Sequence, residues 1–154
     1  MAEQRNSGRG SRHIREVMTQ NPTTVSDRDS IRDVARIMKD QDTGVVPVCD
    51  DHNKIIGLVT DRDIVVRLIA DGKDPLNAHV NEVMTKSVRK VHEDATVDDV
   101  LSLMSSSEIR RVPVVNKNDE LVGIVSIGDI SMEDREQGKV GDAIGDISEG
   151  RPNN

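Results

Sequence analysis

Two stretches of the sequence, GVVPVCDDHNKIIGLVTDRDI (residues 44–64) and RRVPVVNKNDELVGIVSIGDI (residues 110–130), decide the fold because the second repeats the pattern of the first. They are separated by a constant offset of 66 residues. The identical pairs include Pro47/Pro113, Gly57/Gly123 and Asp63/Asp129. Agreement of this length indicates a duplicated unit.

The same offset extends the repeat toward the N-terminus without a gap. It places EVMTQNPTTV (16–25) over EVMTKSVRKV (82–91), and SIRDVARIM (30–38) over TVDDVLSLM (96–104). The chain is therefore a tandem duplication.

Each copy predicts one helix ahead of the quoted stretch. Apolar residues recur at i, i+3, i+4 and i+7, which is the period of a helix with one buried face. These residues are Ile31, Val34, Ala35 and Met38 in the first copy, and Val97, Val100, Leu101 and Met104 in the second. Ser26–Asp29 has the S-x-x-D form of a capping box for the first helix, predicted over residues 30–40.

Two strands and a further helix follow in each copy. Residues 45–49 and 55–60 are predicted strands joined by the turn DDHN, and residues 112–115 and 121–126 are their counterparts around KNDE. The closing helices begin near Asp61 and Ile127. Because a unit of 50–60 residues is at best marginally stable alone, we expect two β-α-β-β-α repeats packed about a pseudo-twofold axis through their sheets, in one α/β (α+β) module.

Composition excludes several kinds of protein. The 154 residues carry a net charge of −7 and include no Phe, Tyr or Trp, which counts against nucleic-acid binding through stacked bases or a basic surface. Cys49 is the single cysteine, so no intramolecular disulfide is possible, and we expect it to be buried. The apolar runs are too short to span a bilayer and the N-terminus lacks a signal-peptide core, so we expect a cytoplasmic protein.

The repeated signature is an apolar pair before Pro, a short hairpin, and then G-h-h-[ST]-x-x-D-[IL], where h is apolar. It occurs as VVPV…GLVTDRDI and as RVPV…GIVSIGDI. This signature resembles the CBS domain, in the tandem arrangement often called a Bateman module. The resemblance covers most of the chain, with one repeat over residues 13–72, the second over 79–133, and no catalytic domain beside them.

The two ends lie outside the resemblance. We expect residues 1–12 to be a disordered tail. Residues 134–154 form a polar tail, in which Val140, Ala143, Ile144 and Ile147 have helical spacing.

The resemblance implies a regulatory module. Many CBS pairs bind adenosine-containing ligands such as AMP, ADP, ATP or S-adenosylmethionine in clefts between the repeats, and many form homodimers. The adenosine nucleotide is then a regulatory ligand, and no other cofactor is expected. The regulated protein partner cannot be named from the sequence.

The residues themselves support a ribose site. Thr60 and Ser126 present hydroxyls where a strand gives way to a helix, and the free N–H groups at such a helix start favour a phosphate. Asp63 and Asp129 follow three residues later, on the same side, and a carboxylate there accepts hydrogen bonds from both ribose hydroxyls. The alternative is that each Asp only stabilises the first turn of its helix.

Carrying the family pattern over predicts two clefts, with adenine read near Pro47 or Pro113. The first cleft comprises Thr60, Arg62, Asp63, Ala95, Val100, Ile109, Arg110 and Arg111. The second comprises Ser126, Gly128, Asp129, Asp29, Val34, Thr43, Gly44 and Val45. Because the arginines fall in the first cleft, we expect it to bind a phosphorylated adenosine. We expect the second to bind weakly or to take a less charged ligand. Arg110 and Arg111 could instead be an exposed pair that balances an acidic surface.

Catalysis finds no support in the sequence. His13, His52, His79 and His92 are dispersed without zinc-ligand spacing, and no nucleophile lies beside a base. We therefore predict a ligand-sensing module rather than an enzyme. The competing hypothesis is a structural or dimerisation module that binds no small molecule.

Overall fold

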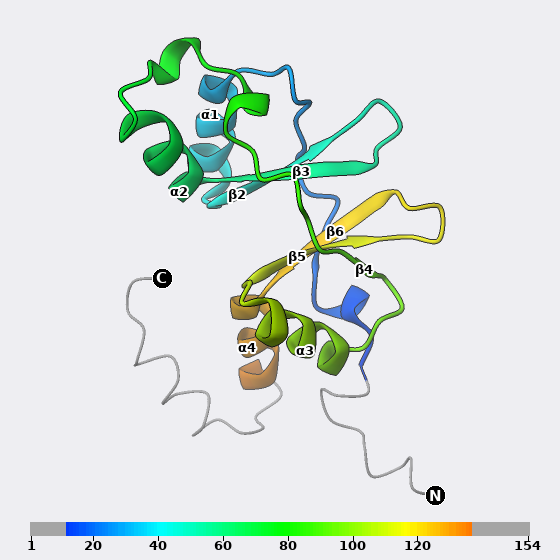
Figure 1. The fold of residues 1–154 in the computed structure, drawn as a ribbon. Helices are drawn as coiled ribbons and strands as arrows, with labels where there is room; N and C mark the ends of the chain where they lie inside the picture. The colour runs from blue at the N-terminus through cyan, green and yellow to red at the C-terminus, as the bar shows by residue number, and fades with distance from the viewer. Residues whose placement is uncertain (1–11, 137–154) are drawn as a thin grey trace, which may run out of the picture.

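The computed structural model describes the backbone of residues 12–136 and the side chains of residues 12–133. Our predictions for residues 1–11 and 137–154 lie outside this range. The chain forms two lobes, one for each copy of the repeat (Figure 1). The α/β fold class is confirmed, since each lobe packs helices against a small β-sheet.

The first lobe contains α1 (Ile31–Gln41), β2 (Val45–Cys49), β3 (Ile55–Thr60) and α2 (Asp61–Ile64), which continues as a π-helix over Val65–Ile69. The second lobe contains β4 (Val91–His92), α3 (Val97–Ser107), β5 (Arg111–Val115), β6 (Leu121–Ser126) and α4 (Ile127–Glu136). The segment that links the two copies forms short 3-10 turns at Pro75–Asn77 and Val80–Glu82, which pack against the first lobe. A further 3-10 turn, Ile14–Glu16, precedes the short strand β1 (Thr19–Gln20). The predicted helices and hairpins are thus present, with β5 starting one residue earlier than expected.

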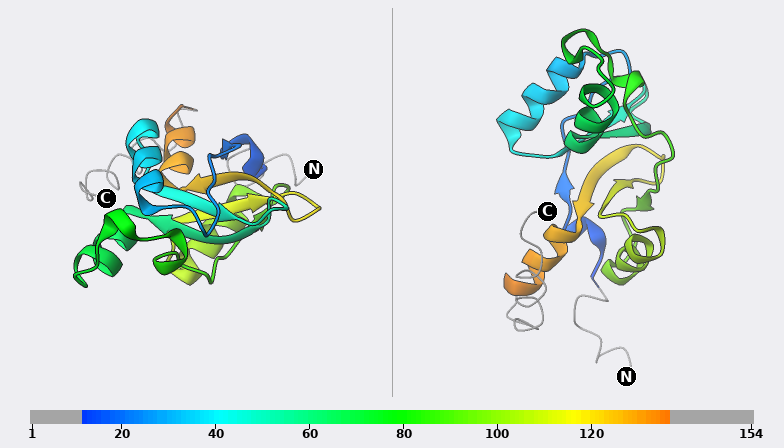
Figure 2. Two further views of the ribbon diagram at one scale, coloured as in Figure 1. Left: turned by 90° about the horizontal axis from the view of Figure 1, so that it is seen from above. Right: turned by 60° about the vertical axis from the view of Figure 1, so that its left-hand side comes forward.

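The two copies exchange their leading segments. Strand β1 belongs to the first copy, but it pairs with β6 of the second, with Thr19 opposite Ile124. In the mirrored contact, Thr85 of the second copy bridges to Leu58 on β3. Figure 2 shows β1 beside β6 before the chain passes to the other lobe. Each sheet is therefore completed by the other copy.

The hydrophobic cores are exchanged in the same way. Ile14 is fully buried in the core of the second lobe, although it lies at the start of the first repeat in sequence. Its counterpart Val80 is fully buried in the core of the first lobe, as is Val83. Because each core includes residues from the opposite copy, the two copies fold as one unit.

The exchange explains why both copies carry glycine in the second strand of the hairpin. A Cβ at Gly57 would lie 2.9 Å from Met84 Sδ and 3.0 Å from the Thr85 carbonyl oxygen. A Cβ at Gly123 would lie 2.9 Å from both Cγ and Cε of Met18. Met18 and Met84 belong to the repeated EVMT segment, so glycine here allows that segment to cross the hairpin closely.

The start of α1 corrects one prediction. The side chain of Ser30, not Ser26, caps this helix by accepting a hydrogen bond from Asp33 N at 3.1 Å. The S-x-x-D sequence closes the preceding turn, where Ser26 N donates to the Asp29 carboxylate at 2.9 Å. The cap of α1 therefore lies four residues later than the sequence pattern predicts.

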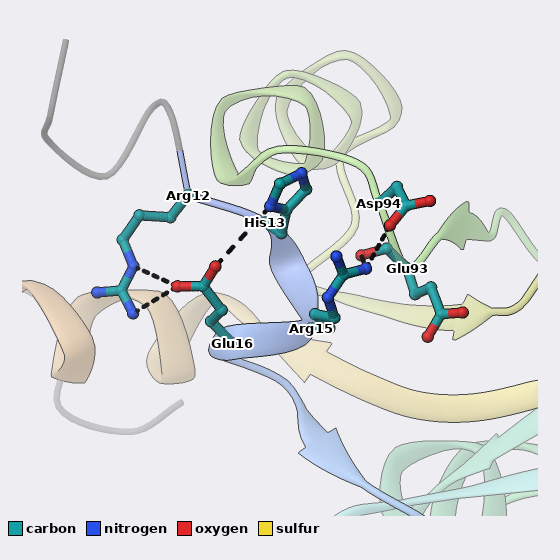
Figure 3. Close-up of polar contacts among 6 residues, drawn as sticks. All are labelled: Arg12, His13, Arg15, Glu16, Glu93 and Asp94. Atoms are coloured by element: carbon teal, nitrogen blue, oxygen red, sulfur yellow. Dashed lines mark hydrogen bonds and ion pairs between the residues drawn. The ribbon is translucent and has the colours of Figure 1, made fainter. Parts of the chain in front are cut away.

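Ion pairs hold the N-terminal segment against the second lobe (Figure 3). The Arg12 guanidinium contacts Glu16 through Nε at 3.2 Å and Nη2 at 3.1 Å, and it also pairs with Glu133 on α4. Arg15 pairs with Asp94, and this hydrogen bond lowers the pKa of the Asp94 carboxyl. These contacts anchor the exchanged segment at its beginning.

Candidate functional site

A cavity of about 390 Å³ lies at the seam between the two copies. Known small-molecule sites begin at about 300 Å³, so this space is large enough for a nucleoside. It brings together six residues predicted for the second cleft or for adenine recognition. They are Thr43, Gly44, Val45 and Pro47 from the first copy, and Ser126 and Asp129 from the second.

Local hydrogen bonds fix Ser126 and Asp129. Ser126 N donates to Asp129 Oδ2 at 2.9 Å, and Asp129 N donates to Ser126 Oγ at 3.1 Å. This reciprocal pair is a capping box at the start of α4. Thr60 and Asp63 repeat it at the start of α2, with the same two distances. Both aspartates therefore stabilise the first turn of their helix through Oδ2. The other carboxylate oxygen, Oδ1, is left to accept hydrogen bonds from a ribose.

That second oxygen has different surroundings in the two copies. Asp63 Oδ1 lies 4.0 Å from the Nε of Arg67, one helical turn later. The residue equivalent to Arg67 in the second copy is Glu133, which pairs with Arg12 instead. Among the side chains described, Asp129 has no ion-pair partner, so its second oxygen is available to a ligand in the cavity.

Arg111 lines the second cleft, although it was predicted for the first. It pairs directly with Ser126 across β5 and β6, and directly paired residues project from the same face of a sheet. Its side chain therefore lines the cavity beside Ser126. The expectation that the second cleft has no cation is wrong, because the register of this hairpin supplies one.

Arg111 lines the same cavity as two carboxylates. Asp42, which follows the last residue of α1, lines the same space as Asp129. No ion pair joins Arg111 to either of them among the described side chains, so its guanidinium can bind an anionic group. The cavity thus combines one cation with two acidic groups.

Sequence reasoning missed several residues of this cavity. Thr19, Pro22 and Thr23 line it because their segment crosses to the other copy, which no local pattern reveals. At its edge, Gln41 Nε2 donates to Thr23 Oγ1 at 2.7 Å. Ile37 and Ile124 supply apolar wall. The 66-residue offset pairs Thr19 with Thr85. This identity is the sequence signal that could have identified residues 19–23 as part of the site.

Two predicted wall residues are not available to any ligand. Val34 and Val100 are both 0% exposed in the cores of their own lobes. They occupy the inward face of α1 and α3, where the helical period places apolar side chains. Their assignment to the clefts is corrected for this reason.

Asp29 and Ala95 bind the exchanged segments through their backbone carbonyls and do not line the cavity. The Asp29 carbonyl accepts from Val80 N at 2.9 Å, and the Ala95 carbonyl accepts from Ile14 N at 2.7 Å. Gly128 is exposed on α4 and does not line the cavity.

The remaining residues predicted for the first cleft differ in burial, and their assignment to a cleft stays a prediction. Thr60, Asp63 and Ile109 are partly buried, and Pro113 is buried in β5. Arg62 and Arg110 are exposed, and neither has an ion-pair partner among the described side chains.

Comparison with known proteins settles the family. The CBS domain family matches residues 14–70 and residues 80–136. The chain belongs to the CBS domain family. As a CBS pair, it is 42% identical over 138 residues to the uncharacterized protein YlbB of Bacillus subtilis, covering 89% of this chain and 92% of that protein. It is 35% identical over 117 residues to hypoxic response protein 1 of Mycobacterium tuberculosis, covering 76% and 81% of the two chains.

Solved CBS structures share the fold. The crystal structure of hypoxic response protein I with two coordinated zinc ions superposes with a TM-score of 0.71 at 33% identity, covering 78% of this chain and 97% of that one. The CBS domain pair of protein MJ0100, in complex with 5′-methylthioadenosine and S-adenosyl-L-methionine, superposes with a TM-score of 0.72 at 32% identity, covering 81% and 97%.

The described residues of the CBS pair include neither a metal-binding cluster nor a membrane-spanning helix. Within the described side chains, no three His, Cys, Asp or Glu groups are placed to hold a metal ion. No helix in residues 12–136 has both the length and the apolar character needed to cross a bilayer.

Proposed function

We propose that this CBS pair is a sensor of an adenosine-containing ligand, which binds in the second cleft and changes how the protein interacts with a partner. The observation that carries the proposal is the seam cavity, in which Ser126, Asp129 and Arg111 meet residues 43–45 of the other copy. A cavity built jointly by two folded copies is a typical small-molecule site.

Each part of an adenosine monophosphate has a partner in this cleft. The second oxygen of Asp129 would accept hydrogen bonds from the ribose hydroxyls. The apolar side chains of Val45, Ile37 and Ile124 would cover the adenine faces without an aromatic residue. The guanidinium of Arg111 would hold the phosphate.

A related structure supports the ligand class. The CBS domain pair of protein MJ0100, at 32% identity, was solved with two adenosine compounds, 5′-methylthioadenosine and S-adenosyl-L-methionine. Both contain the adenine and ribose that the second cleft would recognise.

Regulation would follow from the shared walls of the cleft. Residues 43–45 belong to the first copy and residues 126–129 to the second, so a ligand touching both favours one arrangement of the two copies. A ligand shifts such an equilibrium only by its difference in affinity for the two arrangements. A partner protein that binds one arrangement better would then respond to the ligand.

Thermal unfolding with adenosine, AMP, ADP, ATP and S-adenosylmethionine tests the proposal. A ligand at 100 times its Kd should stabilise the fold by about 2.7 kcal/mol. The Asp129→Ala variant should lose this response to a ligand of the second cleft. Asp99→Ala is the matched control, because Thr96 and Asp99 form the same capping box at 3.1 and 3.2 Å without lining the cavity.

The outcomes separate the alternatives. Stabilisation that is lost in Asp129→Ala and kept in Asp99→Ala supports the proposal. No stabilisation of the wild-type protein by any of the five compounds would reject it.

A second candidate function is an association module with no ligand. It is favoured by exposed apolar side chains in the segment that extends α2, where Val65, Val66 and Ile69 are 53%, 44% and 55% exposed. Light scattering after size-exclusion chromatography tests it. A dimer that dissociates in Val66→Asp, combined with the absence of any ligand response, would favour this candidate.

A further inference from the structure

The outward face of α1 carries a stripe of positive charge. Arg32, Arg36 and Lys39 are exposed and lie at i, i+4 and i+7, so they project from one side of the helix. Asp33 and Asp40 flank this stripe, and the Asp33 carboxylate lies 3.8 Å from the Arg36 guanidinium. Within the described range of the chain, Arg32 and Lys39 form no ion pair. The stripe can therefore receive a segment with several carboxylates.

The matching face of the second copy has a different character. With the 66-residue offset, the three positions hold Asp98, Ser102 and Ser105 on α3. These residues line an open depression on the surface of that helix. Because the second copy folds in the same way without these cations, the fold alone does not account for the stripe on α1.

An exposed apolar surface lies on the neighbouring helix. α1 packs against α2, and the π-helix that continues α2 exposes Val65, Val66 and Ile69. The equivalent positions of the second copy hold Ser131, Met132 and Arg135, so only one of them is apolar. Single exposed apolar residues are ordinary, but three within one short segment indicate a surface that another segment covers. We define the α1–α2 surface as Arg32, Arg36, Lys39, Val65, Val66 and Ile69.

The sequence that follows α4 complements both parts of this surface. Asp142, Asp146 and Glu149 have the spacing i, i+4 and i+7, which is the spacing of the stripe. Apolar residues at positions 140, 143, 144 and 147 alternate with them. In a helical conformation the acidic and the apolar side chains would project from different sides. One side would suit the cations of α1, and the other would suit the apolar side chains that continue α2.

The length of the chain allows this contact. α4 begins beside the seam cavity, which the last turn of α1 also lines. Its 10 residues run away from the first lobe for about 15 Å (Figure 1). Residues 137–142 can span up to about 20 Å, so they can return along α4 toward the end of α1. A segment arriving there would run antiparallel to α1, and it would meet the C-terminal end of the stripe first.

We infer that residues 140–149 fold back onto the α1–α2 surface of the same chain. The three carboxylates pair in order with the three cations: Asp142 with Lys39, Asp146 with Arg36, and Glu149 with Arg32. Exposed ion pairs are individually weak, but a tethered segment has an effective concentration of about a millimolar, so several weak contacts can hold it. None of these six side chains lines the ligand cavity, so the contact is independent of the proposed function.

Paramagnetic relaxation in the 154-residue chain tests the contact. A nitroxide attached to Ser148→Cys, in a Cys49→Ala background, broadens the amide signals of residues that lie near position 148. The signals of residues 32–39 and 65–69 should weaken roughly twofold or more, as expected for a segment bound about half of the time. The signals of residues 98–105 on α3 should be unchanged.

Charge reversal tests the cause of the contact. The stripe variant is Arg32→Glu, Arg36→Glu and Lys39→Glu, and it should lose the broadening. A control variant changes the net charge equally at exposed positions of the second copy and should keep the broadening; it is Lys86→Glu, Arg89→Glu and Lys117→Glu. Adding Asp142→Lys, Asp146→Lys and Glu149→Lys to the stripe variant should restore the broadening.

Two measurements keep the test decisive if the stripe variant misfolds. The three lysine substitutions in the C-terminal segment alone leave the helices and strands unaltered, and they should abolish the broadening. Raising NaCl to about 1 M should also reduce it in the chain with the native charges, because exposed ion pairs are screened by salt.

A mixed sample separates the same chain from a second copy. It combines spin-labelled chain without isotope and ¹⁵N-labelled chain without the spin label. Broadening in this mixture as strong as in the doubly labelled chain would overturn the inference in favour of association between chains. Absence of broadening on α1 in the doubly labelled chain, or broadening that survives both charge reversals, would also overturn it. No nucleotide is present in these samples, so none of these results changes the proposed function.

Discussion

Replacing Gly123 with alanine should destabilise the protein through one identified contact between the copies. The added Cβ would lie 2.9 Å from both Cγ and Cε of Met18 and still closer to its Sδ. Real Cβ atoms essentially never approach so closely, so the Met18 side chain must leave its place on β6. Overpacking of this kind costs about 1–3 kcal/mol. We expect the free energy of unfolding in urea to fall by about 2 kcal/mol.

A double-mutant cycle with Met18→Ala identifies the cause. Met18→Ala alone should cost about 2 kcal/mol, at the low end for a buried methionine because the side chain is only partly buried. In the double variant, the methyl group of alanine at position 123 enters the space left by the Met18 thioether. The total loss in free energy of unfolding should therefore stay at about 2 kcal/mol and not reach the sum of the two single losses. Additive losses would refute the reasoning.

A second glycine provides a control of opposite sign. A Cβ at Gly128 meets only Ser126 Oγ, at an ordinary 3.6 Å, and Gly128 lies in α4. Gly128→Ala should therefore stabilise the protein by about 0.5–1 kcal/mol, as expected for a compatible helix position. Equal destabilisation at both glycines would show that close packing against Met18 is not the cause.

Three smaller predictions follow from individual contacts. Burial, with a contribution from the charge of Asp50, raises the pKa of Cys49 to about 11. Iodoacetamide at pH 7.5 should therefore label the native protein very slowly and the urea-unfolded protein rapidly. Rapid labelling of the native protein, measured by mass spectrometry, would contradict this. The hydrogen bond from Arg15 lowers the Asp94 pKa, so this pair stabilises the fold above the unfolded carboxyl pKa, and its contribution is lost as pH falls through the folded value. Arg15→Ala should move the NMR titration midpoint of Asp94 upward, and an unchanged midpoint would count against the pair. Ser30→Ala should cost about 1 kcal/mol in urea unfolding because it removes the cap of α1, and no loss would show that the cap is dispensable.

Local sequence patterns were sufficient for the elements of each copy. The apolar periods and the turn residues gave the helices and both hairpins, because these depend on neighbours within a few residues. The 66-residue offset gave the duplication. The resemblance to CBS pairs predicted that Ser126 and Asp129 lie near residues 43–45 of the other copy, and these residues line one cavity.

Contacts between distant segments could not be predicted in this way. The crossing of residues 14–20 to the second lobe depends on tertiary packing, and it decides the roles of Gly123 and Thr23. The wrong assignments have the same origin. Val34 has helical spacing that predicts burial, yet it was placed in a cleft by family analogy, and Arg111 needed the hairpin register to show which face it occupies.

A crystal structure of the protein with AMP tests the central claim most directly. The account predicts ligand density in the seam cavity, with the ribose hydroxyls on Asp129 and the phosphate near Arg111. Density for AMP at any other place on the chain, with the Asp129 cavity holding only solvent at saturating AMP, would contradict it.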